Sequence, residues 1–162
     1  MNRIEHTLDL GAAELFPLAR EAILSWELHE SAGVLARPLR RIEVGHLVDL
    51  RLNPMWPRPP RCLRGEELTI PVGACQIAEV VDDEDRAGFT YRTQPGHLVS
   101  GDETFLVSVG ADGRLGVTIS STSMPGHPLL RAVAPLSVAG QTLMARRYAH
   151  GLRQALKGAS AG

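Results

Sequence analysis

The chain has 162 residues, which is the size of one domain, and a domain of this size buries about 70% of the surface that its unfolded chain exposes. Its formal net charge is −1 and its basic residues are dispersed, which excludes the basic footprint of a general nucleic-acid-binding protein. The charged N-terminus lacks an apolar signal-peptide core and no run of about 18 apolar residues occurs, so we expect a cytoplasmic protein with no integral membrane segment.

The first part of the chain predicts a strand and one long helix. Residues 3–10 alternate between apolar and polar side chains, which indicates a strand that ends at Gly11. From Ala12 to about Glu30 apolar residues recur at helical spacing, which predicts a single amphipathic helix. Gly33 follows and suits a left-handed cap at the helix C-terminus.

The middle of the chain predicts two strands separated by a proline-rich loop. Residues 45–52 form the second predicted strand. Residues 53–61 (NPMWPRPPR) contain four prolines and cannot donate regularly to a sheet, so we expect an extended loop or an excursion at a sheet edge. Residues 68–81 predict a long strand that bends at Pro71 and Gly73.

A β-hairpin over residues 88–109 is the element around which the chain is organised. Its two arms alternate with period two, and its connecting segment, residues 94–102, is rich in polar and ionisable side chains. A further strand is predicted over residues 114–121. Apolar residues then recur at helical spacing between about residues 128 and 157, which predicts a long C-terminal helix.

These elements describe an α+β fold in which a curved antiparallel sheet wraps around the long C-terminal helix. We assign residues 1–157 to a single domain and residues 158–162 to a flexible C-terminal tail. A bent sheet that grips a helix leaves a concave apolar space, and such spaces bind small ligands. We therefore expect a small apolar ligand as the partner.

Two residues of the hairpin are the candidate catalytic residues, His97 and Glu103. A carboxylate beside an imidazole favours its charged form and fixes its tautomer, which is the arrangement that general acid–base chemistry needs. A turn held by hydrogen bonds from these side chains to the backbone explains the same residues without chemistry. Both interpretations stay open at this point.

Five further residues are candidates for ligand contact: Trp26, His29, Tyr91, Gln94 and Tyr148. Trp26 and His29 are three apart and so are neighbours on the predicted helix, where they either line the mouth of the cavity or form a core tryptophan beside a surface histidine. The two tyrosines bring hydroxyl groups to a mostly apolar space. No metal or cofactor is predicted, because the histidines show no HExxH pattern and Cys62 and Cys75 no CxxC spacing.

Four segments carry a family resemblance: residues 26–33 (WELHESAG), 74–81 (ACQIAEVV), 88–105 with the core Y-x-T-x-PGH-x-x-x-G-x-E-x-F, and 146–148 (RRY). On these the chain resembles the UPF0548 family, also called the domain-of-unknown-function 1990 family, over about its last four fifths. The resemblance implies the helix-grip fold of the START and Bet v 1 type. The proline-rich insertion over residues 53–67 departs from the compact loop that the family implies.

The helix-grip scaffold hosts lipid carriers, hormone receptors, cyclases and passive binders, so it implies a fold better than a function. We predict a protein that holds a lipid, isoprenoid or polyketide-like ligand. The alternative is a cyclase, dehydratase or hydrolase that uses His97 and Glu103 as acid and base. A third interpretation is a protein-interaction module that presents Trp56 and its prolines to a partner, although Trp56 also suits a staple for the loop or a cover over the cavity. The sequence specifies no oligomeric state.

Overall fold

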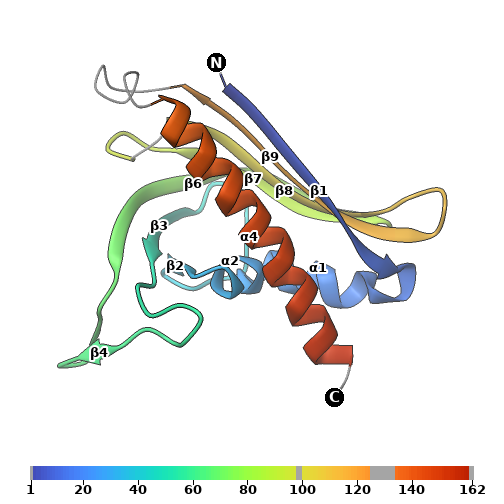
Figure 1. The fold of residues 1–162 in the computed structure, drawn as a ribbon, viewed down its shortest axis with the longest axis horizontal. Coiled ribbons are helices and arrows are strands. Elements are labelled where there is room, and N and C mark those ends of the chain that lie inside the picture. Colours follow the sequence, from blue (N-terminus) through green and yellow to red (C-terminus); the bar gives the residue numbers. More distant parts are fainter. Residues whose placement is uncertain (1, 98–99, 125–133, 161–162) are drawn as a thin grey trace.

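The computed structural model describes residues 2–97, 100–124 and 134–160 (Figure 1). A seven-stranded sheet runs in the order β1-β9-β8-β7-β6-β3-β2, and each neighbouring pair is antiparallel. Its strands are β1 (Asn2–Ala12), β2 (Val34–Arg37), β3 (Leu47–Leu52), β6 (Ile70–Asp82), β7 (Arg86–Thr93), β8 (Ser100–Val109) and β9 (Arg114–Met124). A separate small hairpin consists of β4 (Cys62–Leu63) and β5 (Glu66–Glu67).

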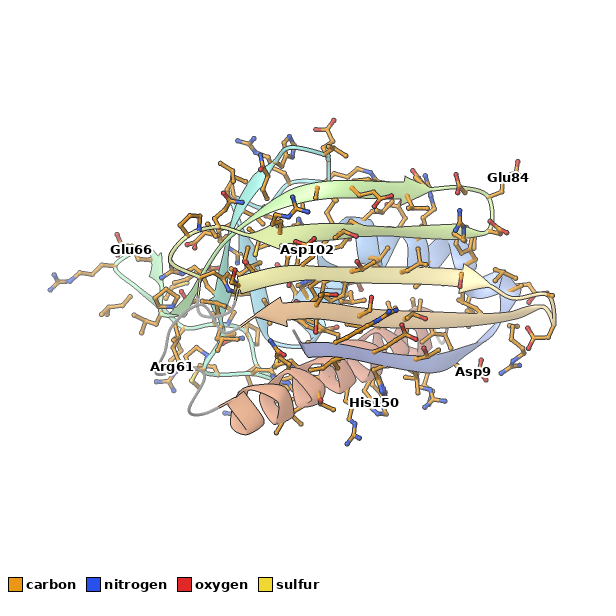
Figure 2. All side chains as sticks on the ribbon, turned by 90° about the horizontal axis from the view of Figure 1, so that it is seen from above. Asp9, Arg61, Glu66, Glu84, Asp102 and His150 are labelled. Atoms are coloured by element: carbon orange, nitrogen blue, oxygen red, sulfur yellow. The ribbon has the colours of Figure 1, made fainter. Side chains whose placement is uncertain are left out.

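The helices all lie on one side of the sheet (Figures 1 and 2). They are the 3-10 turn η1 (Ala13–Leu15), α1 (Phe16–Leu24), α2 (Glu27–Ser31) and α4 (Ala134–Ser160). Figure 1 shows α4 crossing the sheet diagonally, with α1 and α2 beside its C-terminal half. This is the predicted helix-grip arrangement of a curved antiparallel sheet around a long C-terminal helix, and the α+β fold is confirmed.

The pairing of β6 with β3 contains an irregularity. The register between the two strands shifts between Leu50 and Arg51, so that Val72 of β6 has no partner residue. Gly73 beside it has a φ of 140°, a conformation that favours glycine. The bend predicted at Pro71 and Gly73 is therefore a β-bulge, and bulges increase the local bend and twist of a strand.

The core lies between the sheet and the helices and is rich in aromatic rings. Alternate residues of β7 and β8 point into it, and Phe89 stacks on Phe105 with ring centroids 5.3 Å apart. Both side chains are almost fully buried, and burial of one such side chain contributes about 1.5–3 kcal/mol. From the helix side Trp26 and Tyr148 complete this cluster.

The prediction of one continuous helix from Ala12 to Glu30 is wrong. The helix breaks at Ser25 and Trp26, because Trp26 adopts a left-handed conformation with a φ of 70°. Its indole then turns into the core, where Nε1 donates a hydrogen bond of 3.0 Å to the carbonyl oxygen of Arg40. The cap predicted at Gly33 is present, with a φ of 83° and its N–H bonded to the carbonyl oxygen of Glu30.

Three further features of the secondary structure differ from the prediction. Strand β2 was missed, because its four residues are mostly buried and show no alternation. The proline-rich insertion contains the β4–β5 hairpin, which the sequence did not predict. Helix α4 continues to Ser160, past the predicted end at residue 157. The predicted start of this helix, residues 128–133, and the last two residues of the predicted tail, 161–162, lie outside the described residues.

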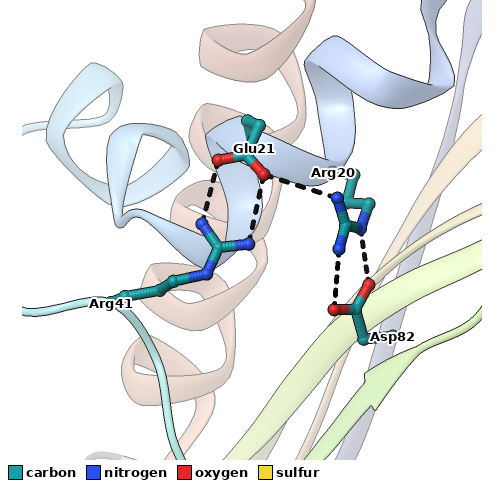
Figure 3. A network of polar contacts seen from close by, with 4 residues as sticks. All are labelled: Arg20, Glu21, Arg41 and Asp82. Carbon is teal, nitrogen blue, oxygen red and sulfur yellow. Dashed lines mark hydrogen bonds and ion pairs between the residues drawn. The ribbon is translucent and has the colours of Figure 1, made fainter.

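Exposed ion pairs connect α1 to its surroundings (Figure 3). Arg20 binds both carboxylate oxygens of Asp82 at the end of β6, and Glu21 binds both terminal nitrogens of Arg41 at 2.9 and 3.1 Å. Such exposed pairs contribute little free energy, so their effect is to fix the orientation of α1. Within the described ranges no helix is long and apolar enough to cross a membrane.

Candidate functional site

A cavity of about 340 Å³ lies between α4 and the inner face of the sheet. Its apolar wall includes Val34, Leu50, Leu52, Val72 and Met144. Its polar groups include Tyr91, Thr93, His97, Glu103, Ser121, Thr122, Gln141 and Tyr148. The surface of the cavity is mostly apolar by area, with polar groups from both the sheet and α4, which is the usual make-up of a small-molecule site.

The register of the β7–β8 hairpin places Tyr91 directly opposite Glu103. Pairs on the outer face of the sheet hold this register: Thr90 and Thr104 hydroxyl oxygens are 2.8 Å apart, and Arg92 donates to both carboxylate oxygens of Asp102 at 2.8 and 3.0 Å. Asp102 is visible on that face in Figure 2. Since side chains alternate along a strand, the residues between these outer pairs point inward to the cavity.

The Tyr91 hydroxyl donates a hydrogen bond of 2.6 Å to Oε2 of Glu103. Glu103 is half-buried and lines the cavity. Burial raises the pKa of Glu103 to about 7, and the hydrogen bond from Tyr91 opposes that rise. Near neutral pH the carboxyl group is therefore present in both protonated and ionised forms, so it can donate or accept a proton in the cavity.

Tyr148 reaches the same cavity from α4. Its ring contacts Phe105 edge to face, with centroids 5.1 Å apart. Burial and the charge of Glu103 raise the pKa of Tyr148 well above its ordinary value, and the same two causes raise that of Tyr91. Both phenols therefore stay protonated and can donate hydrogen bonds.

His97 lines the cavity from the turn that follows β7. Its backbone N–H donates to the carbonyl oxygen of Gln94 at 3.1 Å, and the turn packs closely on the bulge in β6. A Cβ atom at Gly73 would lie 2.6 Å from the His97 Cα, so only glycine admits this approach. The structure thus brings the predicted catalytic residues His97 and Glu103 to one cavity, and their acid–base role stays a prediction.

Trp26 and His29 lie in the core beneath the cavity and are not among its lining residues. The alternative of a surface histidine is wrong, because His29 is fully buried among aromatic rings, at 4.4 Å from Phe105 and 4.8 Å from Tyr148 between centroids. Neither ring nitrogen of His29 has a hydrogen-bond partner within the described part of the chain, and burial lowers its pKa to about 3. The imidazole is therefore neutral.

Gln94 stays in the turn rather than the cavity lining, and its Nε2 donates to the carbonyl oxygen of Arg92 at 3.4 Å. The residues that the sequence analysis missed include Gln141 and Met144 of α4 and Ser121 of β9. A signal for the first two was available, because both share a helical face with Tyr148 at spacings of seven and four.

Trp56 staples the proline-rich loop to the body of the protein. Its Nε1 donates a hydrogen bond of 2.9 Å to the carbonyl oxygen of Ser31, and the Arg147 guanidinium lies 3.9 Å from its ring centroid. A Cβ atom at Gly33 would lie 2.8 Å from the Trp56 Cγ, so glycine there lets the indole approach. Trp56 does not line the cavity, and its predicted use as a cover is not supported.

No group of three metal-ligating side chains capable of holding an ion occurs within residues 2–97, 100–124 and 134–160. The two cysteines, Cys62 and Cys75, are free thiols. Burial raises the pKa of Cys75 to about 12, so this thiol stays protonated and is a poor nucleophile.

A family model described as "Domain of unknown function (DUF1990)" matches residues 1–151. The chain belongs to the DUF1990 family. A UPF0548 protein of Deinococcus radiodurans is 40% identical to it over 80 residues, which are 49% of this chain and 40% of that protein. The chain thus aligns with less than half of the length of that relative, and the predicted family resemblance is confirmed.

Solved structures share the fold of this DUF1990 chain. A hypothetical protein of Helicobacter pylori matches with a TM-score of 0.60 at 7% identity, over 94% of this chain and 84% of that one. A protein of Nitrosomonas europaea matches with a TM-score of 0.58 at 14% identity, over 99% and 97%. The Bet v 1-like protein Ara h 8.0201 matches with a TM-score of 0.50 at 15% identity, over 97% and 95%. At these identities the likeness shows the fold alone.

Proposed function

We propose that this DUF1990 protein binds a small, largely apolar molecule in the cavity between the sheet and α4. The observation that carries the proposal is the hydrogen-bonded pair of Tyr91 and Glu103 in a wall that is otherwise mostly apolar. A lipid, isoprenoid or polyketide-like ligand would bury its hydrocarbon against Val72 and Met144. Its polar end would meet the Glu103 carboxyl group and the Tyr148 hydroxyl.

The polar groups of the cavity favour an uncharged polar group on the ligand over an anionic one. The hydrogen bond that Glu103 accepts from Tyr91 comes from an uncharged donor, and burial disfavours the ionised form of the carboxyl group. An anionic head group would add a second negative charge to a desolvated place and is disfavoured. A carbonyl or hydroxyl group fits better, because the protonated carboxyl group and the Tyr148 hydroxyl can donate hydrogen bonds to it.

Gly140 offers a direct test of the site. It lines the cavity from α4, and a Cβ atom there would meet no other atom within 4 Å, so a leucine side chain can be added without a clash at its base. The test titrates wild type and Gly140→Leu with N-phenyl-1-naphthylamine, an uncharged apolar fluorophore. Native mass spectrometry of protein purified from its own host would then identify any molecule that co-purifies.

We expect Gly140→Leu to weaken binding of the fluorophore at least tenfold. Gly158→Leu is the matched control, because Gly158 also lies in α4 in open space and does not line the cavity. Equal binding by wild type and Gly140→Leu would show that the fluorophore binds elsewhere, and would count against the cavity as the ligand site.

A second candidate function is an enzyme that uses this cavity, and the raised pKa of Glu103 favours it. A carboxyl group that titrates near neutral pH is suited to proton transfer, and His97 and Tyr148 line the same cavity. The test incubates the co-purified molecule with protein in deuterium oxide. Deuterium gained at carbon with wild type, and lost in Glu103→Gln, would support proton transfer; no gain with wild type would leave binding as the function.

A further inference from the structure

A second hollow, of about 840 Å³, lies between the proline-rich loop and the C-terminal half of α4. We call it the loop groove. It shares no lining residue with the cavity, because Met144 and Tyr148 of α4 face the cavity while Arg146, Arg147 and His150 face the loop groove. Figure 2 shows His150 on the outer side of α4. The loop groove therefore forms a separate candidate site.

The lining of the loop groove carries an excess of positive charge. Both carboxylates in the lining, those of Glu67 and Glu30, pair with Arg37. The Arg37 guanidinium donates to Glu67 at 2.8 and 3.0 Å and lies 3.5 Å from Glu30. The other lining arginines are Arg58, Arg146 and Arg147, and no carboxylate lies within ion-pair distance of them in the part of the chain that the structure describes.

Two arginines elsewhere on the surface, Arg20 of α1 and Arg92 on the outer face of the sheet, each bind an aspartate through two nitrogens. The whole chain has a net charge of −1, whereas the charged side chains that line the loop groove are four arginines and two glutamates. Their field also reaches β1, where Arg146 and His150 lower the pKa of His6, second to burial. Uncompensated guanidinium groups that share one concave surface attract an anion.

The proline-rich loop supplies an apolar part of the lining beside these arginines. Trp56 is 40% exposed, and Pro57, Pro59 and Pro60 extend this apolar part beside it. The indole is held in place before any ligand arrives, by its hydrogen bond to the Ser31 carbonyl oxygen and by the Arg147 guanidinium above its ring. A preorganised aromatic surface costs little conformational entropy when a ligand stacks on it.

We propose that the loop groove binds a small organic anion, a phosphate or carboxylate group carried on an aromatic or similarly flat apolar body. The anionic group meets Arg58 and Arg146, because Arg147 already donates to the Ala32 carbonyl oxygen at 2.6 Å and covers part of the Trp56 ring. The flat body lies along the exposed part of Trp56 and the neighbouring prolines. The volume of about 840 Å³ is in the range of small-molecule sites. This proposal does not depend on the ligand of the cavity, since the two sites share no lining residue.

Calorimetric titration of the full chain with 1-naphthyl phosphate tests the proposal. Titration with 1-naphthoate distinguishes carboxylate from phosphate as the preferred group. Titration with inorganic phosphate measures the affinity that the charge gives without the ring. Titration with 1-naphthol measures the affinity that the ring gives without the charge. We expect 1-naphthyl phosphate or 1-naphthoate to bind at least tenfold more tightly than either inorganic phosphate or 1-naphthol.

The double variant Arg58→Gln/Arg146→Gln should weaken binding of the organic anion at least tenfold. Both side chains are exposed, and Arg58 is bonded to Met55 and Asn53 through its backbone, so the variant should fold, which circular dichroism checks. The control Arg61→Gln/Arg153→Gln removes the same charge from residues that do not line the loop groove, and should bind like wild type. Gly140→Leu should also bind like wild type, because it alters only the cavity.

Four results would overturn the proposal. The first is no binding of either organic anion by wild type at millimolar concentration. The second is equal affinity of the double variant and wild type. The third is equal affinity for 1-naphthol and 1-naphthyl phosphate, which would show that the arginines add nothing. Loss of binding in Gly140→Leu with retention in the double variant would assign the probe to the cavity and reject the loop groove.

Discussion

The Tyr91 hydroxyl and the Glu103 carboxylate face each other across neighbouring strands, with 2.6 Å between Oη and Oε2. This contact is the main polar feature of the cavity, and it works against the effect of burial on the pKa of Glu103. A hydrogen bond donated to a carboxylate stabilises the ionised form, whereas desolvation destabilises it. The protonation state of Glu103 near neutral pH therefore depends on both effects.

Replacement of Tyr91 by phenylalanine should raise the pKa of Glu103 further above its value of about 7. The variant keeps the apolar ring and removes only the hydroxyl that donates to the carboxylate. A titration of the Glu103 side-chain carboxyl carbon by ¹³C NMR measures the effect. Tyr148→Phe is the matched control and should change this pKa less, because Tyr148 is not among the causes of the Glu103 shift. A lower pKa in Tyr91→Phe would contradict the assignment.

In wild type, Glu103 should lower the free energy of unfolding as pH rises from about 4.5 to about 7. Glu103→Gln should abolish this contribution. The carboxyl group titrates near 4.5 in the unfolded chain and near 7 in the fold, so in this window the unfolded chain ionises first and is favoured. Each pKa unit corresponds to about 1.4 kcal/mol, which gives roughly 3 kcal/mol over the window. Below pH 4.5 the effect is absent, and above pH 7 it is constant.

Urea unfolding of wild type and Glu103→Gln at several pH values between 4 and 8 measures this difference. The free energy of unfolding of wild type, relative to that of the variant, should fall across the window and then level off. Glu79→Gln, at an exposed position of β6, is the control and should follow wild type. Parallel curves for wild type and Glu103→Gln would show that the carboxyl group is not desolvated in the fold.

His29 should give a pH dependence of the opposite sign. Its pKa is lowered by burial from 6.5 to about 3, so between these values the unfolded chain takes up a proton that the fold does not. Stability is therefore lost as pH falls from 6.5 toward 3, by roughly 5 kcal/mol at most. Between about pH 4.5 and 6.5 this trend offsets that of Glu103, so the wild-type profile should be flatter than that of either single variant.

His29→Phe tests this inference, because phenylalanine keeps a ring among the surrounding aromatic side chains. We expect the free energy of unfolding of the variant to rise as pH falls from about 6.5 to 4.5, because the Glu103 trend then acts without the opposing trend of His29. The larger ring adds a packing cost of about 1–3 kcal/mol, but that cost is the same at every pH and leaves the slope unaffected. Urea unfolding at pH 4, 5, 6 and 7 measures the slope, and a wild-type slope in His29→Phe would contradict the assignment.

The sequence predicted the hairpin well because its pattern is local. The period-two alternation of the first arm predicts that Phe89, Tyr91 and Thr93 share one face, as the structure has them. Glu103 was grouped with the polar turn, although its spacing of two from Phe105 puts both on the same face of β8. Continuing the alternation back from Phe105 would have predicted the pairing of Glu103 with Tyr91.

The rest of the site depends on contacts between distant parts of the chain. The break at Trp26 follows from a core position and from a hydrogen bond to Arg40, neither of which helical periodicity reveals. Periodicity placed Tyr148 on the buried face of the C-terminal helix, but only the packing of α4 on the sheet brings it to Glu103. The loop groove was missed for the same reason, because the anchor of Trp56 is Arg147, ninety-one residues later.

Trp56→Leu should detach the proline-rich loop and lower the free energy of unfolding by about 1–3 kcal/mol. The variant removes the hydrogen bond to the Ser31 carbonyl oxygen and the contact with the Arg147 guanidinium, which lies 3.9 Å from the ring centroid. Urea unfolding gives the free energy, and limited proteolysis should show faster cleavage within residues 53–61. Leu63→Ala in the same insertion is the control, since Leu63 is 60% exposed and should behave like wild type. If Trp56→Leu kept wild-type stability and protease resistance, Trp56 would be free to serve a partner protein, as the interaction-module interpretation requires.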